Sequence, residues 1–246
     1  MITLRSCPVC NCREIMEYHQ IGLAPHVAHE LMPGVPVPAA IISRYSQCRD
    51  CHVIFQNPRM SDKELDRYYG EGYYRRTINL TDKEKDADEM YRATMDAKII
   101  KHHLGDVPSH LDIGCSRGYL LEQVGAASRV GEESEVDYVT ASGIKVYSDI
   151  DEVGKKRFDL VTAIHALEHV ADPLTFLKRM VAATNRNGHL IIEVPTWKSP
   201  GGPLRLPHLF HFEPDVLKLL CKHVGLTVVH VEFTPHLMFI CQADNN

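Results

Sequence analysis

The chain has 246 residues, of which 44% are hydrophobic and 24% are charged, and its formal net charge is -5. These values are typical of a globular protein with one large domain, or with one medium and one small domain. The negative charge argues against a surface built to bind duplex nucleic acid.

No run of about 18 apolar residues is present, so we expect no membrane span. The first residues, MITLRSCPVCNCRE, lack the apolar core of a signal peptide. We therefore expect a cytoplasmic protein, in which the eight cysteines are thiols or metal ligands rather than disulfides.

Two Cys-x-x-Cys pairs lie near the N-terminus: Cys7, Cys10, Cys48 and Cys51. Two such pairs supply the four thiolates of a tetrahedral zinc site. The long gap between them contains GLAPHVAHELMPGVPVPAA, whose prolines and glycines indicate an irregular insertion. We predict a zinc-ribbon domain over residues 1–58. There are three alternatives to this zinc site: iron bound by the same cysteines, two pairs of buried or redox cysteines without a metal, and a zinc site in which Cys12 or His52 is a ligand.

A short strand over residues 52–56 precedes a helix that begins at Ser61, because Glu64 follows three residues later as in a capping box. A longer helix, EKDADEMYRATMDAKIIKHHL, places small or apolar residues at Ala87, Tyr91, Met95 and Ile99. We predict a helical linker and cap over residues 59–106, with the longer helix packed on the next domain. The N-terminal end of the longer helix, or the GYYRR turn between the helices, is a candidate to close over a ligand.

From residue 107 to 246 strand patterns alternate with helical patterns. The predicted strands are HLDIGC, SRVGEES, IKVYSDI, RFDLVTAIHAL, NGHLIIEVPT, LTVVHVEF and HLMFICQA. Such alternation predicts an α/β fold with a doubly wound, mostly parallel seven-stranded sheet and helices on both faces. Only Thr-Pro separates the last two strands, so we expect them to form an antiparallel hairpin.

The stretch HLDIGCSRGYLLEQV places Gly114, Ser116 and Gly118 between a strand and a helix. Small residues there let a ligand approach the backbone closely, although a tight turn without a ligand has the same pattern. Glu132 and Glu133 follow Gly114 by about 20 positions, where an acidic residue suits ribose hydroxyls. The Gly-x-Ser-x-Gly pattern lacks the further glycine that a pyrophosphate favours, so we predict a nucleoside ligand without phosphates.

At this point the sequence resembles the class I S-adenosylmethionine-dependent methyltransferases. Four segments look like motifs of that family and come in the same order: LDIGCSRGYLL, YSDIDE, FDLVTAIHALEHVADPLTFLKRM and NGHLIIEVPT. The N-terminal part resembles a subgroup with a zinc ribbon, similar to the deoxysugar C-methyltransferases, through CPVC, CRDC, FQNP and YYGEGYY. The family usually has glycine where Ser116 stands, so the serine side chain must be accommodated.

The resemblance implies these cofactor-binding residues: Asp112, Gly114, Ser116, Gly118, Glu133, Asp149, Ile150 and His165. In it Asp112 orients the turn or the methionine amino group, and the two glycines let backbone and cofactor meet. Glu133, rather than Glu132, accepts bonds from the ribose hydroxyls. Asp149 and the Ile150 N–H read the adenine, and His165 lies beside the methyl group. A solvated loop acid is the alternative for Asp149.

An oxygen or carbon acceptor must lose a proton, commonly to histidine or a carboxylate. Residues 197–215, WKSPGGPLRLPHLFHFEPD, follow the fifth strand and are expected to contact the acceptor. We predict His208 as the base or substrate anchor, with His169 and His165 as the next candidates, and we expect His211 to be held in packing. Glu168 and His169 could equally cap and pack the following helix.

The sequence therefore predicts methyl transfer to a small molecule, a nucleotide-linked sugar or a related metabolite, with S-adenosylmethionine and Zn²⁺ as cofactors. One alternative is an RNA- or protein-modifying methyltransferase whose ribbon binds the macromolecule, although residues 1–80 carry no strongly basic face. The other is a non-catalytic S-adenosylmethionine-binding protein, which Ser116 alone suggests. The pattern leaves O-, N- and C-methylation open.

Overall fold

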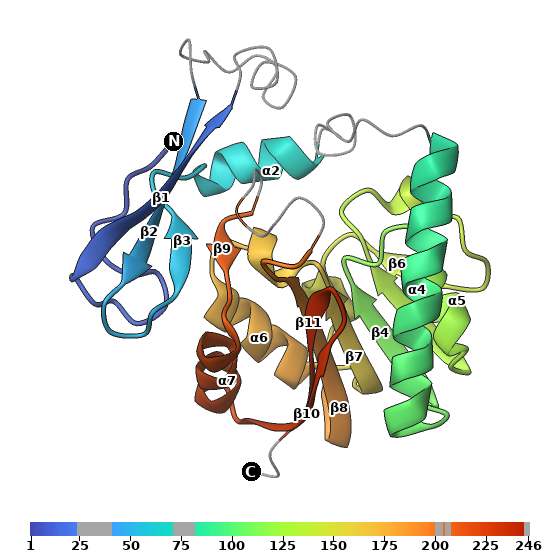
Figure 1. The fold of residues 1–246 in the computed structure, drawn as a ribbon. Coiled ribbons are helices and arrows are strands. Elements are labelled where there is room, and N and C mark those ends of the chain that lie inside the picture. Colours follow the sequence, from blue (N-terminus) through green and yellow to red (C-terminus); the bar gives the residue numbers. More distant parts are fainter. Residues whose placement is uncertain (24–40, 71–81, 200–203, 205–207, 244–246) are drawn as a thin grey trace.

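The structure is a computed structural model that describes residues 1–23, 41–70, 82–199, 204 and 208–243. It contains a seven-stranded sheet and a four-stranded sheet (Figure 1). The strand order of the larger sheet is β10-β11-β8-β7-β4-β5-β6. Its strands are β4 (Ser109–Ile113), β5 (Ser128–Glu132), β6 (Lys145–Tyr147), β7 (Phe158–Ile164), β8 (Thr184–Pro195), β10 (Leu226–Phe233) and β11 (His236–Ala243).

Strand directions in the larger sheet agree with the sequence pattern. The five strands β6, β5, β4, β7 and β8 run parallel to one another. Strand β11 is antiparallel to both β8 and β10. This arrangement confirms the predicted fold class, including the antiparallel hairpin at the end of the chain. It also places the carboxyl ends of β4, β5 and β7 side by side at the same end of the sheet, where α/β proteins bind ligands.

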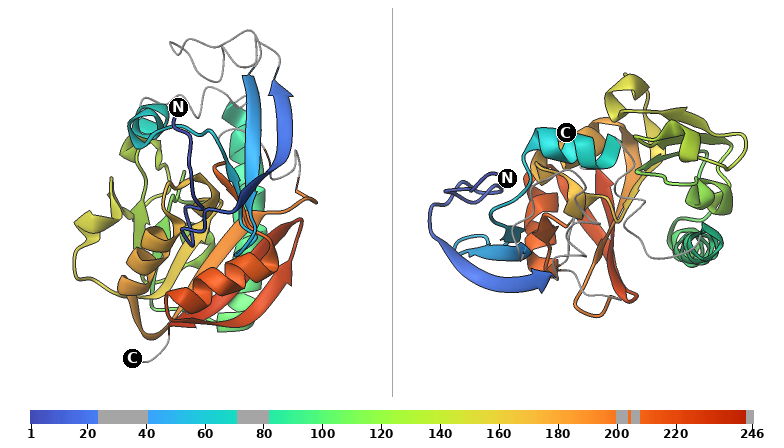
Figure 2. Two further views of the ribbon diagram at one scale, coloured as in Figure 1. Left: turned by 90° about the vertical axis from the view of Figure 1, so that its left-hand side faces the viewer. Right: turned by 90° about the horizontal axis from the view of Figure 1, so that it is seen from above.

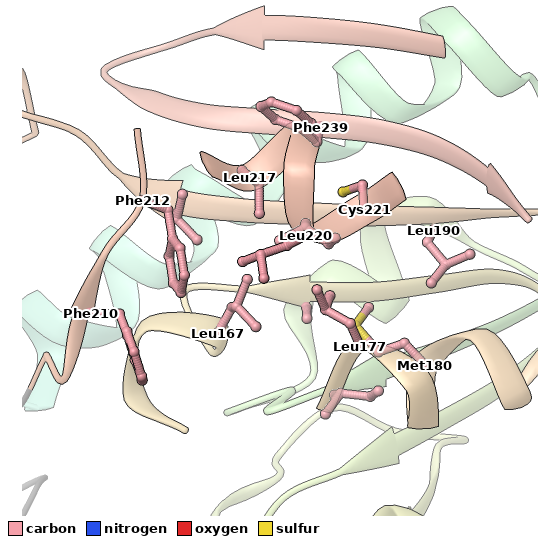
Figure 3. Close-up of a cluster of buried hydrophobic side chains, with 14 of the residues drawn as sticks. Leu167, Leu177, Met180, Leu190, Phe210, Phe212, Leu217, Leu220, Cys221 and Phe239 are labelled. Carbon is pink, nitrogen blue, oxygen red and sulfur yellow. The ribbon is translucent and has the colours of Figure 1, made fainter. Parts of the chain in front are cut away.

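Helices cover both faces of the larger sheet (Figures 1 and 2). Helices α4 (Asp82–Leu104) and α5 (Tyr119–Val124) lie on one face, and α6 (Pro173–Ala182) and α7 (Pro214–His223) lie on the other. Alternate strand residues supply the two apolar layers: Leu160 of β7 packs toward α4 and α5, and Val161 belongs to the layer of α6 and α7. Figure 3 shows part of the second layer, formed by Leu177, Met180, Leu217, Leu220 and Phe239 among others.

Helix α4 packs on the sheet as predicted, but through a different stripe of residues. The buried residues among those described are Ala93, Asp96, Ala97 and Ile100. By contrast, Ala87 is exposed, Tyr91 is 65% exposed and Met95 is 40% exposed, so the predicted stripe was wrong at these three positions. Alanines allow a long helix to approach its neighbours closely, and the larger side chains then remain on the solvent side.

Helix α2 (Asp62–Gly70) begins where the sequence predicted it. The Ser61 N–H and Oγ both donate to the Glu64 carboxylate, at 2.8 and 2.7 Å, and the terminal amine of Met1 also bonds to Glu64. The GYYRR turn after α2 and most of the proline-rich insertion lie outside the described residues.

The smaller sheet has the order β1-β2-β3-β9. Its strands are β1 (Ile15–Leu23), β2 (Ile41–Cys48), β3 (Ile54–Gln56) and β9 (Phe210–His211). The sequence predicted only β3, as residues 52–56. Because β9 comes from the segment between β8 and α7, this sheet joins the N-terminal region to the larger sheet. The division into residues 1–58, 59–106 and 107–246 remains a prediction.

Candidate active site

The turn between β4 and α5 has an unusual backbone. Gly114, Ser116 and Gly118 have φ values of 72°, 50° and 84°, in the left-handed region that non-glycine residues seldom adopt. The N–H groups of Gly114 and Cys115 both donate to the carbonyl oxygen of Glu132, each at 2.9 Å. The turn is thereby fixed against the carboxyl end of β5.

Three carboxylates surround this turn. Glu132 Oε2 accepts from the Gly114 N–H at 3.1 Å, and Glu133 Oε2 accepts from the Ser116 N–H at 3.1 Å. Below the turn, Asp112 accepts from the Thr162 hydroxyl at 2.5 Å. Burial raises the pKa of both Asp112 and Glu132 to about 7. The turn is therefore rich in hydrogen-bond acceptors and suits a cationic ligand that donates hydrogen bonds.

Gly118 is required by the packing of the protein itself. A Cβ atom there would lie 2.8 Å from Ile144 Cδ1 and 2.9 Å from Ala141 Cβ. At Gly114 the nearest such atom would be Ala166 Cβ, at an ordinary 3.5 Å. The space beside Gly118 is thus filled by the segment after β5, which differs from the expectation that a ligand shares it. Contact between the Gly118 backbone and a cofactor remains a prediction.

The amino-terminal part of α4 lies beside the same turn. The Ser116 hydroxyl donates to Glu89 Oε2 at 3.0 Å, and Arg117 Nε lies 3.5 Å from Asp86 Oδ1 and 3.8 Å from Glu89 Oε2. These bonds accommodate the serine that departs from the family pattern. The sequence analysis missed Glu89, because nothing in a charged helix face indicates which acid will meet a distant turn.

Asp149 and Ile150 follow the neighbouring strand, β6. Asp149 caps the short 3₁₀ helix η2 (Ile150–Val153) by accepting from the Asp151 N–H at 2.7 Å. It also forms an ion pair with Arg179 of α6, a residue that the sequence analysis did not identify. The Glu133 N–H donates to the Tyr147 carbonyl at 3.0 Å, which brings β6 beside the three carboxylates. A hollow of about 480 Å³ lined by residues 134–138 lies next to Glu133.

A buried ionic cluster lies at the carboxyl end of β7. His165, with φ of 54°, places Nδ1 3.3 Å from Glu168 Oε1 and Nε2 3.3 Å from Glu193 Oε1. Both glutamates are 1% exposed. Burial by itself lowers the pKa of His165, but the two carboxylates raise it to about 9. The imidazole is therefore protonated at neutral pH and can donate hydrogen bonds, but it cannot accept a proton there.

His169 and His208 lie on the other side of Glu168. Their rings meet edge to face with centroids 4.9 Å apart. Nδ1 of His169 lies 2.8 Å from the hydroxyl of Tyr69, which α2 contributes (Figure 1). The Tyr69 position matched the family pattern, but no role followed from the sequence. The structure thus brings together all three predicted catalytic histidines, His165, His169 and His208, around Glu168.

The remainder of the predicted acceptor segment is described only at residues 197–199, 204 and 208–215. His211 is 3% exposed, and its Nε2 lies 2.9 Å from Glu213 Oε1. Its ring also packs against Trp197, with centroids 4.9 Å apart. His211 is therefore held in packing, as expected.

The four paired cysteines come together in the N-terminal region. Cys7 Sγ lies 3.5 Å from Cys51 Sγ, Cys10 Sγ lies 3.5 Å from Cys48 Sγ, and all four sulfur atoms lie within 4.8 Å of one another. Zn–S bonds of about 2.3 Å in a tetrahedron place sulfur atoms about 3.8 Å apart, so the cluster fits such an ion. Cys12 and His52, the alternative ligands, are outside this group.

Comparisons with known proteins agree with this arrangement. Residues 67–231 match a family described as "Methyltransferase domain". A ubiquinone biosynthesis O-methyltransferase of Bradyrhizobium diazoefficiens is 31% identical over 106 residues, which cover 36% of this chain and 41% of that protein. The chain thus matches less than half the length of this relative.

Solved structures share the fold at low sequence identity. The 1,6-didemethyltoxoflavin N1-methyltransferase of Burkholderia thailandensis, solved with S-adenosylhomocysteine, has a TM-score of 0.60 and 19% identity, covering 81% of this chain and 99% of that one. An amino pentose methyltransferase of Micromonospora echinaspora has a TM-score of 0.52 and 16% identity, covering 67% of this chain and 98% of that one. Among the described residues, no helix has the length and apolar character needed to cross a membrane.

Proposed function

The chain belongs to the methyltransferase-domain family, and we propose that it transfers a methyl group from S-adenosylmethionine to a small molecule. The observation that carries the proposal is the group of three carboxylates, Asp112, Glu132 and Glu133, around the β4–α5 turn. S-adenosylmethionine has a sulfonium, an ammonium group and ribose hydroxyls. Two of the carboxyl groups have a raised pKa because they are buried, so a ligand with positive charge and donor groups fits this turn.

In this proposal four of the predicted cofactor residues keep the roles that the family resemblance implies. Glu133 accepts hydrogen bonds from the ribose hydroxyls, and Asp112 supports the turn from below. Asp149 accepts from the adenine amino group, in competition with Arg179, and the Ile150 N–H donates to an adenine nitrogen. These roles need only small side-chain movements, because the groups already lie at the ends of adjacent strands.

On the acceptor side, the bound cofactor supplies an already activated methyl group, so the protein must align the acceptor, exclude water and remove its proton. His165 is protonated and forms ion pairs with Glu168 and Glu193. His208 and His169 are the remaining candidates to bind the acceptor and take its proton. His208 is 2% exposed, so an acceptor that reaches it is screened from water.

A nucleotide-linked sugar or a related anionic metabolite is the proposed acceptor. Arg59 supports it: this side chain is 7% exposed, and its Nε and Nη1 have no hydrogen-bond partner among the described residues. Asp62 and Asp172 already act on this charge, but the two N–H groups without a hydrogen-bond partner could bind an anionic group such as a phosphate. It lies in the segment before α2, the helix that supplies Tyr69 to the histidine cluster.

We further propose that residues 1–58 form a ribbon that is folded around one Zn²⁺, held by Cys7, Cys10, Cys48 and Cys51. Four thiolates leave no open coordination position, so the ion stabilises this region and takes no part in the reaction. Through β9 and α2, the folded ribbon region holds Tyr69 and His208 in place.

The test is methyl transfer itself. The purified full-length protein is incubated with methyl-labelled S-adenosylmethionine and a panel of nucleotide sugars, free sugars, RNA and proteins. The proposal expects label in a nucleotide sugar or related metabolite together with release of S-adenosylhomocysteine. Label in RNA or protein alone would contradict the proposed acceptor. Tight cofactor binding with no transfer to any acceptor would support a non-catalytic binding protein instead.

A further inference from the structure

The Glu168 carboxylate is buried without the hydrogen bonds that a buried charge needs. It is 1% exposed, and neither Oε1 nor Oε2 has a hydrogen-bond partner among the described residues. A buried carboxylate in this state is costly, and native proteins compensate it with charge partners or with a metal ion. Its environment therefore has to supply positive charge.

Buried carboxyl groups crowd this end of β7. His165 lies between Glu168 and Glu193, at 3.3 Å from each, so one imidazole ring is shared by two buried carboxylates. Asp96 is also buried beside this cluster, at 7% exposure, and is close enough to interact with Glu193 and His165. The shared imidazole ring therefore leaves both Glu168 oxygens without a hydrogen bond among the described residues.

The imidazoles on the other side of Glu168 are arranged as ligands. Glu168, His169 and His208 each offer one atom, and these atoms lie within 4.8 Å of one another. His169 places Nε2 3.8 Å from Glu168 Oε1, while its Nδ1 meets the Tyr69 hydroxyl at 2.8 Å. A metal-bound histidine is commonly oriented by such a bond from its second nitrogen.

The backbone holds this group together across distant parts of the chain. The Leu209 N–H donates to the Glu168 carbonyl oxygen at 2.7 Å, which fixes His208 beside the 3₁₀ turn η3 (Leu167–His169). The Tyr45 hydroxyl of β2 donates to the His208 carbonyl oxygen at 3.2 Å. The backbone is thus fixed on both sides of the group. Side-chain rotations that move each ligand atom by about an ångström bring the three atoms to metal-ligand distance.

We propose that Glu168, His169 and His208 bind one divalent transition-metal ion, separate from the ion of the cysteine cluster. Two imidazoles and one carboxylate favour Zn²⁺, Fe²⁺ or Co²⁺ over Mg²⁺ and Ca²⁺, which prefer oxygen ligands alone. Three protein ligands leave at least one coordination position open, as in catalytic rather than structural sites.

An open position at this point takes an oxygen ligand. Binding of the ion does not depend on the proposed function, but its use does: if the chain is a methyltransferase, the open position binds the acceptor oxygen and makes its hydroxyl more acidic. The acceptor would then be a hydroxyl compound, whose proton would pass to solvent while its oxygen attacks the methyl carbon and the bond from the methyl carbon to the cofactor sulfur breaks. His169 and His208 would act together as ligands, and neither would need to be the base.

The experiment measures metal content of the full-length protein after saturation with Co²⁺ and removal of free ions, counting zinc and cobalt together. We expect two ions per chain in the native protein, and one in Glu168→Gln and in His208→Ala. The control is His230→Ala, which alters the partly exposed group of His103, His230 and Glu232, whose atoms also lie within 4.8 Å of one another. That variant should keep two ions.

The inference is overturned if Glu168→Gln and His208→Ala bind as many ions as the native protein, or if His230→Ala is the variant that loses one. Glu168→Gln is nearly isosteric, and its thermal unfolding and cofactor affinity report whether it is folded; His169→Ala serves in its place if it is not. If the protein binds S-adenosylmethionine but holds only one ion, the second metal site is excluded and the proposed function is not. If it holds two ions but does not bind S-adenosylmethionine, the proposed function is excluded and the second metal site is not.

Discussion

Substitution of Gly118 by alanine tests how the β4–α5 turn is built. The residue has φ of 84°, and left-handed backbone costs an alanine about 1–2 kcal/mol. The new Cβ would lie 2.8 Å from Ile144 Cδ1 and 2.9 Å from Ala141 Cβ, closer than real Cβ contacts. Overpacking of this kind costs about 1–3 kcal/mol, so we expect a total loss of about 2–5 kcal/mol in the free energy of unfolding.

Gly105 provides the matched control for this substitution. Its φ is 68°, but a Cβ there would meet no atom within 4 Å. Gly105→Ala should therefore lose only the backbone contribution, about 1–2 kcal/mol. Urea unfolding of both variants, at unchanged m-value, gives the difference. Equal destabilisation of the two variants would refute the packing argument. A stable Gly118→Ala that has lost cofactor binding would show instead that a ligand shares this space.

Three further predictions concern metal, acceptor and pH. Cys48→Ser should lose the zinc of the N-terminal cluster, as measured by elemental analysis; full retention of metal would exclude the four-cysteine site. His208→Ala should lower turnover by a factor of about 10²–10⁴ at unchanged cofactor affinity, and a normal rate on the true acceptor would reject its role. Burial raises the pKa of Asp112 to about 7, so the folded state retains its proton and loses stability as pH rises from about 4 to 7. Asp112→Asn should therefore gain stability relative to the native protein above pH 7, by up to about 4 kcal/mol in pH-dependent unfolding; a pH-independent difference would contradict it.

The larger sheet could be predicted because its signals are local. β7 and the second half of β8 are mostly apolar, and the two-residue connection between β10 and β11 fixes their antiparallel direction. The prediction for β8 differed in one respect. It was expected to follow an Asn-Gly turn, whereas the strand begins at Thr184 and Asn187 lies within it with φ of 64°. Thr184 pairs with Phe158 of β7 and His189 pairs with Leu160, so the Asn-Gly pair lies in an irregularity of the strand between these two pairings.

The contacts between distant segments could not be predicted in the same way. Strand β9 has only two residues, and it exists because β3 presents an edge for it to pair with. The Glu89 bond to Ser116, the Arg179 pair with Asp149 and the Tyr69 bond to His169 each join residues far apart in the chain. Residue type and spacing indicate which groups are capable of chemistry. Only the fold determines which of them meet.

Calorimetric titration of the full-length protein with S-adenosylmethionine tests the central claim most directly. The account predicts one site per chain in the native protein. Glu133→Ala should weaken binding by about 1.5–3 kcal/mol, or roughly 10- to 150-fold, because it loses a charge-assisted bond to the ribose. Glu232→Ala, on the distant strand β10, should bind as the native protein does. Absence of binding to the native protein, or equal affinity of the Glu133 and Glu232 variants, would contradict the account.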